Sequence, residues 1–68
     1  MLNTKKIKAR MVECGVTQRD VANKLEVALP TASQKINGIR PLYLDEAEKL
    51  ADLLAIEKGT FGSYFFAQ

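Results

Sequence analysis

The chain has 68 residues and a net charge of +2; 47% of its residues are hydrophobic, and histidine is absent. This composition indicates one small globular domain over residues 1–68, near the lower size limit for a self-sufficient core, and it argues against disorder. No apolar run approaches the ~18 residues of a membrane span, and no signal peptide follows the N-terminal lysines, so we expect a cytoplasmic protein without a membrane partner.

The first predicted helix covers residues 4–13. Ile7, Met11 and Cys14 recur at the i, i+4, i+7 spacing of a buried helix face, and Gly15 supplies a left-handed stop. Cys14, the only cysteine, is expected to pack on that face as a small hydrophobe. One cysteine and no histidine exclude an intrachain disulfide and an ordinary zinc site, and they remove the commonest acid–base catalyst. We therefore expect no enzyme, no metal and no cofactor.

The second and third predicted helices are separated by a short turn. The second begins after Thr17, whose hydroxyl can cap it, with Asp20 placed three residues later as in a capping box. The third begins near Leu29 or Pro30, because proline is tolerated only in a first helical turn. The Asn-Gly dipeptide at 37–38 ends the third helix.

The fourth predicted helix covers residues 44–54, and a last short helix covers residues 60–65. The inward side chains expected on the fourth helix are Leu44, Ala47, Leu50, Ala51 and Leu54. The sequence has no strand pattern. The expected fold class is therefore all-α, a compact domain of five helices whose second and third helices form a helix-turn-helix.

The segment TQRDVANKLEVALPTASQKINGIRP resembles the Cro/C1-type helix-turn-helix family, and the likeness covers about residues 4–56. The positions that match the family pattern are Thr17, Gln18, Ala22, Leu25, Val27, Asn37 and Gly38. The NGIRPLYLDEAEKLADLL segment and the closing YFF are similar to small repressors encoded by phages of Gram-positive bacteria. Glu26 stands at the usual glycine position, which implies either a positive φ there or a slightly different turn.

The resemblance implies a lambda-repressor-like fold and a sequence-specific, double-stranded DNA-binding transcriptional regulator, a phage Cro or repressor-like protein in a bacterial host cell. Its recognition helix, about residues 29–36, would lie in the major groove with Ala32 and Ile36 inward. The base-reading candidates are Leu29, Pro30, Ser33 and Gln34. The phosphate-contact candidates are Lys5, Lys6, Gln18, Arg19, Lys35 and Arg40.

The charge distribution agrees with a side that faces a polyanion. Residues 1–40 hold eight basic and three acidic residues, a net charge of +5, and residues 41–68 hold two basic and five acidic residues, a net charge of −3. The alternative is that the cations and Gln34 only solvate helix faces and that Leu29 is a stray surface residue or a lid over the core. A second class of function also remains open, a protein-interaction module of the same fold, similar to an antirepressor or antitoxin.

Two further expectations come from comparing the chain with this family. Met11 and Ile36 occupy the positions where relatives often place a buried Arg–Glu pair, and we expect these two apolar side chains in contact. Near the C-terminus, Phe61 and Phe65 are assigned to the core. Tyr64 and Phe66 are assigned to a weak homodimer contact, formed in solution or only on a two-fold DNA site.

Overall fold

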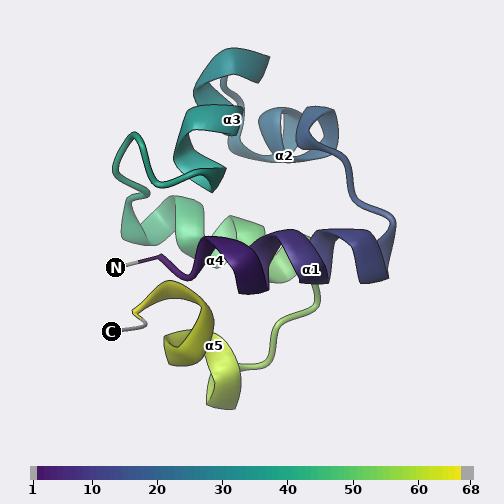
Figure 1. Cartoon of the computed structure of the whole chain (residues 1–68), viewed down its shortest axis with the longest axis vertical. Helices are drawn as coiled ribbons and strands as arrows, with labels where there is room; N and C mark the ends of the chain where they lie inside the picture. Colours follow the sequence, from purple (N-terminus) through teal and green to yellow (C-terminus); the bar gives the residue numbers. More distant parts are fainter. Residues whose placement is uncertain (1, 67–68) are drawn as a thin grey trace.

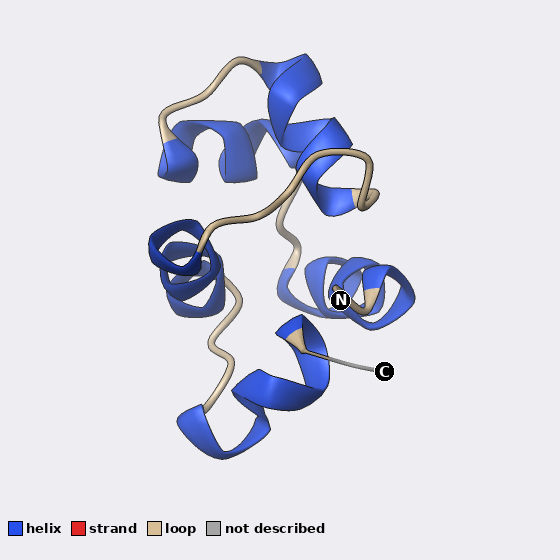
Figure 2. Cartoon of the chain, turned by 90° about the vertical axis from the view of Figure 1, so that its left-hand side faces the viewer, coloured by secondary structure: helices blue, strands red, loops and turns tan. Residues whose placement is uncertain are grey.

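The computed structural model describes residues 2–66, which contain five helices and no strand. The helices are α1 (Thr4–Cys14), α2 (Gln18–Leu25), α3 (Leu29–Ile36), α4 (Leu44–Leu53) and α5 (Lys58–Phe65). The α2–α3 pair forms one end of the molecule and α5 the opposite end, with α1 and α4 lying between them (Figures 1 and 2). The all-α fold with five helices is therefore confirmed, and each helix begins and ends within about two residues of its expected position.

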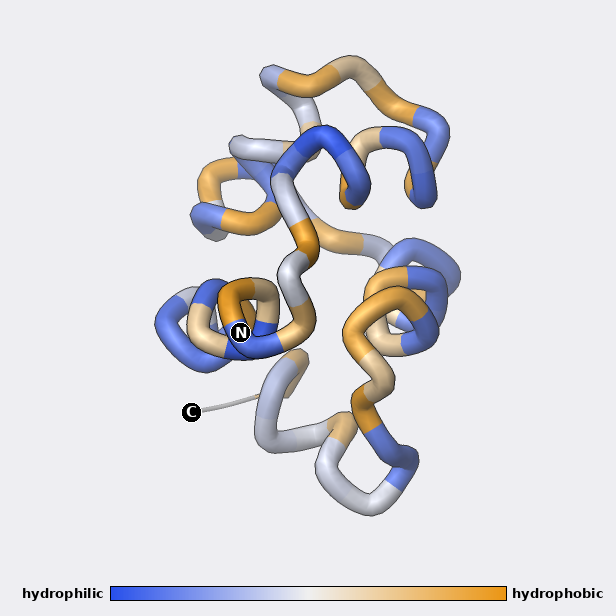
Figure 3. The backbone as a smooth tube through the Cα atoms, turned by 90° about the vertical axis from the view of Figure 1, so that its right-hand side faces the viewer, coloured by the Kyte–Doolittle hydropathy of each residue, from blue (hydrophilic) through white to orange (hydrophobic). Residues whose placement is uncertain are grey.

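The hydrophobic core receives side chains from all five helices. Its buried members are Ile7, Met11, Val21, Ala22, Leu25, Ala32, Ile36, Ala47, Leu50, Ala51, Leu54 and Phe65. In Figure 3, α1 and α4 each carry both hydrophilic and hydrophobic residues, which is the pattern of helices that bury one face. Phe65 is buried as expected, whereas Phe61 is only partly buried against the same cluster.

Local capping explains where α2 begins and ends. The Asp20 N–H donates to Thr17 Oγ1 at 3.2 Å, and the Thr17 N–H donates to Asp20 Oδ2 at 2.9 Å, so the expected capping box is present. The bond from the Thr17 backbone N–H, and after it the Thr17 side chain, hold the pKa of the Asp20 carboxyl below its usual value. At the other end Glu26 has a φ of 57°, so of the two alternatives expected at this non-glycine position the structure has the positive φ.

Helix α1 is fastened to α4 through Arg10. The Arg10 Nε–H donates to the Leu54 carbonyl oxygen at 2.8 Å, and Nη2 donates to the Ala55 carbonyl oxygen at 3.3 Å. Carbonyl groups at the end of a helix lack partners within the helix and carry partial negative charge. Arg10 therefore serves the fold, since it satisfies the end of α4 from a neighbouring helix.

Two expected core positions lie at the surface instead. Cys14 is exposed, and its Sγ lies 3.4 Å from the Leu54 carbonyl oxygen. Leu44, expected to face inward, is 60% exposed. Both residues occupy a terminal turn, Cys14 the last position of α1 and Leu44 the first of α4. The helical repeat predicts the direction in which a side chain points. At the end of a helix, however, a side chain can extend beyond the neighbouring helices that cover the middle.

Candidate nucleic-acid interface

The α2–α3 pair is held together by a tight turn and a shared buried surface. The Val27 N–H donates to the Ala22 carbonyl oxygen at 3.0 Å, which closes α2 and reverses the chain direction. Val21 and Ala32 are both 0% exposed, and α2 packs directly on α3. This packing fixes the orientation of α3 at one end of the molecule (Figure 1).

Helix α3 has one buried face and one accessible face. Ala32 and Ile36 are inward as expected, with exposures of 0% and 1%. Among the four base-reading candidates, Leu29 is 39% exposed and Pro30 is exposed, whereas Ser33 and Gln34 are partly buried. The structure therefore places all four where at least part of the side chain reaches solvent.

Two of the polar residues on this helix, Ser33 and Gln34, are already hydrogen-bonded to other residues of the chain. Asn37 Nδ2 donates to the Ser33 carbonyl oxygen at 2.7 Å and to Ser33 Oγ at 3.4 Å. The Gln34 side-chain oxygen Oε1 accepts a hydrogen bond from Nε of Arg40. This second contact was not predicted from the sequence; its only local indication was the Asn-Gly turn that folds the chain back after α3.

Three of the phosphate-contact candidates are freely accessible near the start of their helices. Gln18 and Arg19 form the first turn of α2, and both are exposed. Lys5 is exposed in the first turn of α1. Backbone N–H groups in the first turn of a helix lack partners within the helix, so the first turn of α2 combines such donors with the Arg19 charge.

Lys35 does not fit the role expected from the sequence. Its residue is only 6% exposed, and its Nζ donates to Glu46 Oε1 at 2.8 Å and to the Pro41 carbonyl oxygen at 3.0 Å. The same ammonium group lies 4.9 Å from the centre of the Tyr43 ring. Because this ammonium group is buried and already hydrogen-bonded within the chain, the expected phosphate contact of Lys35 is wrong. Lys35 stabilises the fold instead.

Lys6 also does not fit its expected role as a phosphate contact, for a different reason. Its Nζ donates to Ser63 Oγ at 3.0 Å and lies 4.8 Å from the centre of the Tyr64 ring. Both partners belong to α5, the helix at the opposite end of the molecule from α2 and α3 (Figure 2). The Lys6 ammonium group is therefore directed away from the α2–α3 end.

Comparison with known protein families identifies the arrangement of these helices. A family profile described as helix-turn-helix matches residues 7–61, a range that includes all of α2, α3 and α4. The chain belongs to the Cro/C1-type helix-turn-helix family. Members of this family are DNA-binding transcription regulators, and that general function applies to this member. A search among curated proteins gave no significant match.

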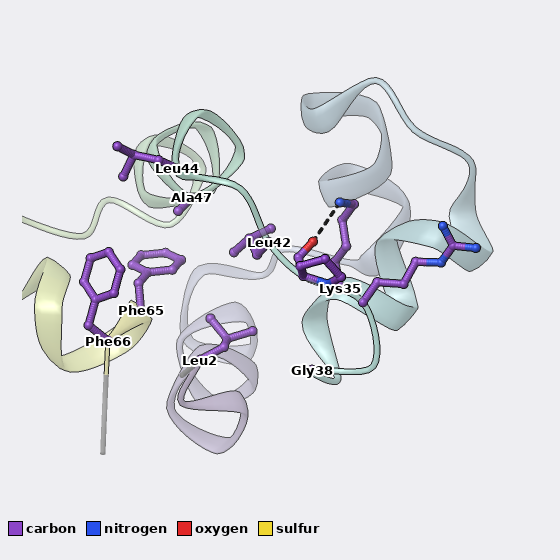
Figure 4. Close-up of a pocket in the computed structure, with 10 residues that line it drawn as sticks. Leu2, Lys35, Gly38, Leu42, Leu44, Ala47, Phe65 and Phe66 are labelled. Atoms are coloured by element: carbon purple, nitrogen blue, oxygen red, sulfur yellow. Dashed lines mark hydrogen bonds between the residues drawn. The ribbon is translucent and has the colours of Figure 1, made fainter.

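In this family member the C-terminal aromatic residues differ in accessibility. Tyr64 is partly buried against the core, whereas Phe66 is 59% exposed. Phe66 lines an open groove of about 420 Å³, together with Leu2, Leu42, Leu44 and Phe65. Figure 4 shows the rings of Phe65, the last residue of α5, and of Phe66 just after it, with Leu2 from the N-terminal segment nearby and Leu44 on α4 across the groove.

Within residues 2–66, no group of three or more His, Cys, Asp or Glu side chains could hold a metal ion. No helix in the same part of this helix-turn-helix protein has the length and apolar character needed to cross a bilayer.

Proposed function

We propose that this protein is a sequence-specific regulator that binds double-stranded DNA through α3 in the major groove, as a phage Cro or repressor-like protein in the cytoplasm of a bacterial host. In this proposal Leu29, Pro30, Ser33 and Gln34 face base edges. The protein represses transcription by occupying an operator and excluding polymerase.

The division of α3 into two faces carries the proposal. Ala32 and Ile36 are fully buried in the core, whereas the first turn of α3 keeps Leu29 and Pro30 at the surface. Apolar side chains can lie against the methyl group of thymine, and a glutamine amide can hydrogen-bond to base edges. The accessible face of α3 therefore offers both kinds of contact that read sequence in the major groove.

Phosphate contacts are proposed for Gln18, Arg19 and Arg40, with Lys5 as a further candidate. Gln18 and Arg19 lie exposed in the first turn of α2, and the exposed Arg40 donates a hydrogen bond to Gln34 on α3. Such contacts set the position of a protein on the duplex without reading its sequence. They also make affinity depend on salt, because each neutralised phosphate releases counterions.

A weak homodimer is proposed near the C-terminal end of α5, with Phe66 and the exposed part of Tyr64 in the contact. The support is the 59% exposure of Phe66 beside the 60% exposure of Leu44, across a groove that both residues line. Tyr64 contributes less, because its ring is partly buried and is covered by the Lys6 ammonium group. Pairing on a two-fold site is the usual route by which helix-turn-helix proteins gain affinity.

Selection of bound duplexes from a randomised pool tests the proposed function. A single motif should be enriched, and binding to that motif in fluorescence-anisotropy titrations should weaken as salt rises. Gln34→Ala should cost about 1–3 kcal/mol on the selected duplex and little on a random duplex. Thr60→Ala, a change of one polar side chain on α5, is the matched control and should leave both affinities unchanged.

The alternative of a protein-interaction module gives different results. Absence of an enriched motif, or binding to duplex DNA that does not change with salt, would contradict the proposed function and favour that class. Equal losses for Gln34→Ala on selected and random duplexes would show that this residue does not read bases.

A further inference from the structure

The contact between Gln34 and Arg40 is built by the turn that follows α3. The N–H groups of Ile39 and Arg40 both donate to the Gln34 carbonyl oxygen, at 2.9 Å and 3.3 Å. Gly38 permits this reversal with a φ of 76°. The chain thus folds back over the last turn of α3, and the Arg40 side chain lies beside that of Gln34, where Nε donates to Oε1.

The backbone on the other side of Arg40 is fixed as well. The Pro41 carbonyl oxygen accepts a hydrogen bond from the buried Lys35 ammonium group at 3.0 Å (Figure 4). The ring of Pro41 also restricts its own φ. Arg40 is therefore held between two anchored points, and among residues 2–66 no ion pair draws its guanidinium elsewhere.

Gln34 lies on the side of α3 that carries the other base-reading candidates. It follows Pro30 by four residues, and residues four apart in a helix lie on one face. Gln34 is partly buried, whereas Arg40 and Pro30 are exposed. A duplex that approaches the face of α3 on which Pro30 lies would therefore contact the hydrogen-bonded Gln34 and Arg40 side chains together.

Arg40 changes what the Gln34 amide can offer to a base. A free glutamine presents one acceptor and one pair of donors, which match N6 and N7 of adenine. Here one lone pair of the acceptor oxygen takes a hydrogen bond from the Arg40 guanidinium. The positive charge beside the second lone pair disfavours the approach of the partly positive hydrogens of an adenine amino group. The remaining groups, Nε2 of Gln34 and the Nη atoms of Arg40, can only donate.

We propose that Arg40 determines the base preference of Gln34: the pair presents mainly donors and selects the O6 and N7 acceptors of guanine over adenine. The inference rests on the proposed function, because it needs α3 to lie in the major groove. It differs from the adenine preference that an isolated glutamine would have, and it makes Arg40 a specificity-determining residue rather than a phosphate contact alone.

Parallel selections from the same randomised duplex pool test this inference, with the wild-type protein and the Arg40→Ala, Gln34→Ala and Arg19→Ala variants. The position that loses its preference in Gln34→Ala identifies the base pair that Gln34 reads. Wild type should prefer guanine there, and Arg40→Ala should shift the guanine-to-adenine ratio at that position by about tenfold toward adenine. Arg19→Ala, which removes an exposed arginine of α2, should weaken all duplexes and leave the preference unchanged.

Two results would overturn the inference while leaving the proposed function intact. One is adenine preferred by the wild type at the Gln34-dependent position. The other is a uniform loss of affinity in Arg40→Ala with an unchanged base preference, which would make Arg40 a phosphate contact only. Absence of any enriched motif with the wild type would instead reject the proposed function, and the inference with it.

A measurement on the free protein gives a second, independent check. The side-chain amide resonances of Gln34 should shift in the Arg40→Ala variant, because the hydrogen bond to Oε1 is lost. Unchanged Gln34 side-chain resonances would show that the two side chains do not interact in solution, and would also overturn the inference.

Discussion

Lys35 Nζ lies 2.8 Å from Glu46 Oε1, and this ion pair joins the last turn of α3 to the first turn of α4. The two side chains are only 8% and 13% exposed. Glu46 also accepts a hydrogen bond from the Tyr43 N–H at 3.1 Å, and Lys35 donates to the Pro41 carbonyl oxygen. Two charged side chains therefore join the end of α3 to the start of α4 and hold the backbone at Pro41 and Tyr43.

Removing one partner of this pair should destabilise the fold strongly. Breaking a buried ion pair leaves an uncompensated charge and typically costs about 3–5 kcal/mol, so Lys35→Ala should lower the free energy of unfolding by at least about 3 kcal/mol. Urea denaturation measures this loss. Lys49→Ala is the matched control, because Lys49 Nζ is 4.0 Å from Glu26 Oε2 and the Lys49 side chain is 44% exposed. Such a surface pair contributes about 0–1 kcal/mol, and similar losses in both variants would contradict the assignment.

The burial of Lys35 could have been predicted from the sequence, but its ion pair with Glu46 could not. Ala32, Lys35 and Ile36 recur at i, i+3 and i+4, the spacing of one helix face, so the burial of Ala32 and Ile36 placed Lys35 beside them. No local pattern connects Lys35 with Glu46, which is eleven residues away across a loop. That contact depends on how α3 and α4 pack, a tertiary relationship.

Features with local causes were predicted correctly. The Thr17–Asp20 capping box depends on a few neighbouring residues and is present, and the positive φ of Glu26 was one of the two alternatives expected there. The contact of Arg40 with Gln34 was missed because it depends on the path of the loop after Gly38. Leu44 and Cys14 were misplaced because periodicity gives the direction of a side chain and not the cover above it.

Ile36→Ala should cost about 2–5 kcal/mol of unfolding free energy, since Ile36 is 1% exposed and its truncation leaves a cavity. Met11 is buried in the same cluster, and the expected contact between the two is tested by a double-mutant cycle with Met11→Ala. A coupling of about 0.5–3 kcal/mol is expected for touching side chains. Val12→Ala, at a residue 82% exposed, is the control and should change stability by less than about 0.5 kcal/mol. Strict additivity of the two core variants would show that Met11 and Ile36 do not meet.

Stability should depend on pH through Asp20. Its pKa is lowered in the folded state, so its contribution is fully present above the unfolded pKa and is lost as the pH falls through the folded pKa. Asp20→Asn should therefore be less stable than wild type at neutral pH, and the difference should shrink below about pH 4, near the ordinary pKa of an aspartate. Urea denaturation at a series of pH values measures the difference. Thr17→Ser is the control; it keeps the capping hydroxyl and should retain the wild-type pH profile. A stability difference between Asp20→Asn and wild type that does not change with pH would exclude an ionised Asp20 as the cause.

Arg19→Ala should weaken binding to the selected duplex and to random duplexes by similar factors, because phosphate contacts carry no sequence information. It should also reduce the slope of log affinity against log salt by about one, the value for one phosphate contact. Titrations at several salt concentrations measure both effects. Lys58→Ala removes an equally exposed charge from α5 and is the control, with the wild-type slope expected. An unchanged slope in Arg19→Ala would place this arginine away from the DNA backbone.

The proposed homodimer predicts both the form of the operator and the effect of one surface change. If Phe66 pairs two copies, the selected site should be an inverted repeat whose half-site centres are about 34 Å apart, one turn of the duplex. Phe66→Ser should then weaken binding to the full site and leave the affinity for one half-site unchanged, because only the full site brings two copies together. Tyr43→Ser is a matched control, since Tyr43 is a similarly exposed aromatic residue that does not line the groove. Sedimentation and footprinting on both DNA lengths decide the outcome. A monomer that protects one asymmetric half-site, with Phe66→Ser binding as tightly as wild type, would show that this end of the molecule does not pair.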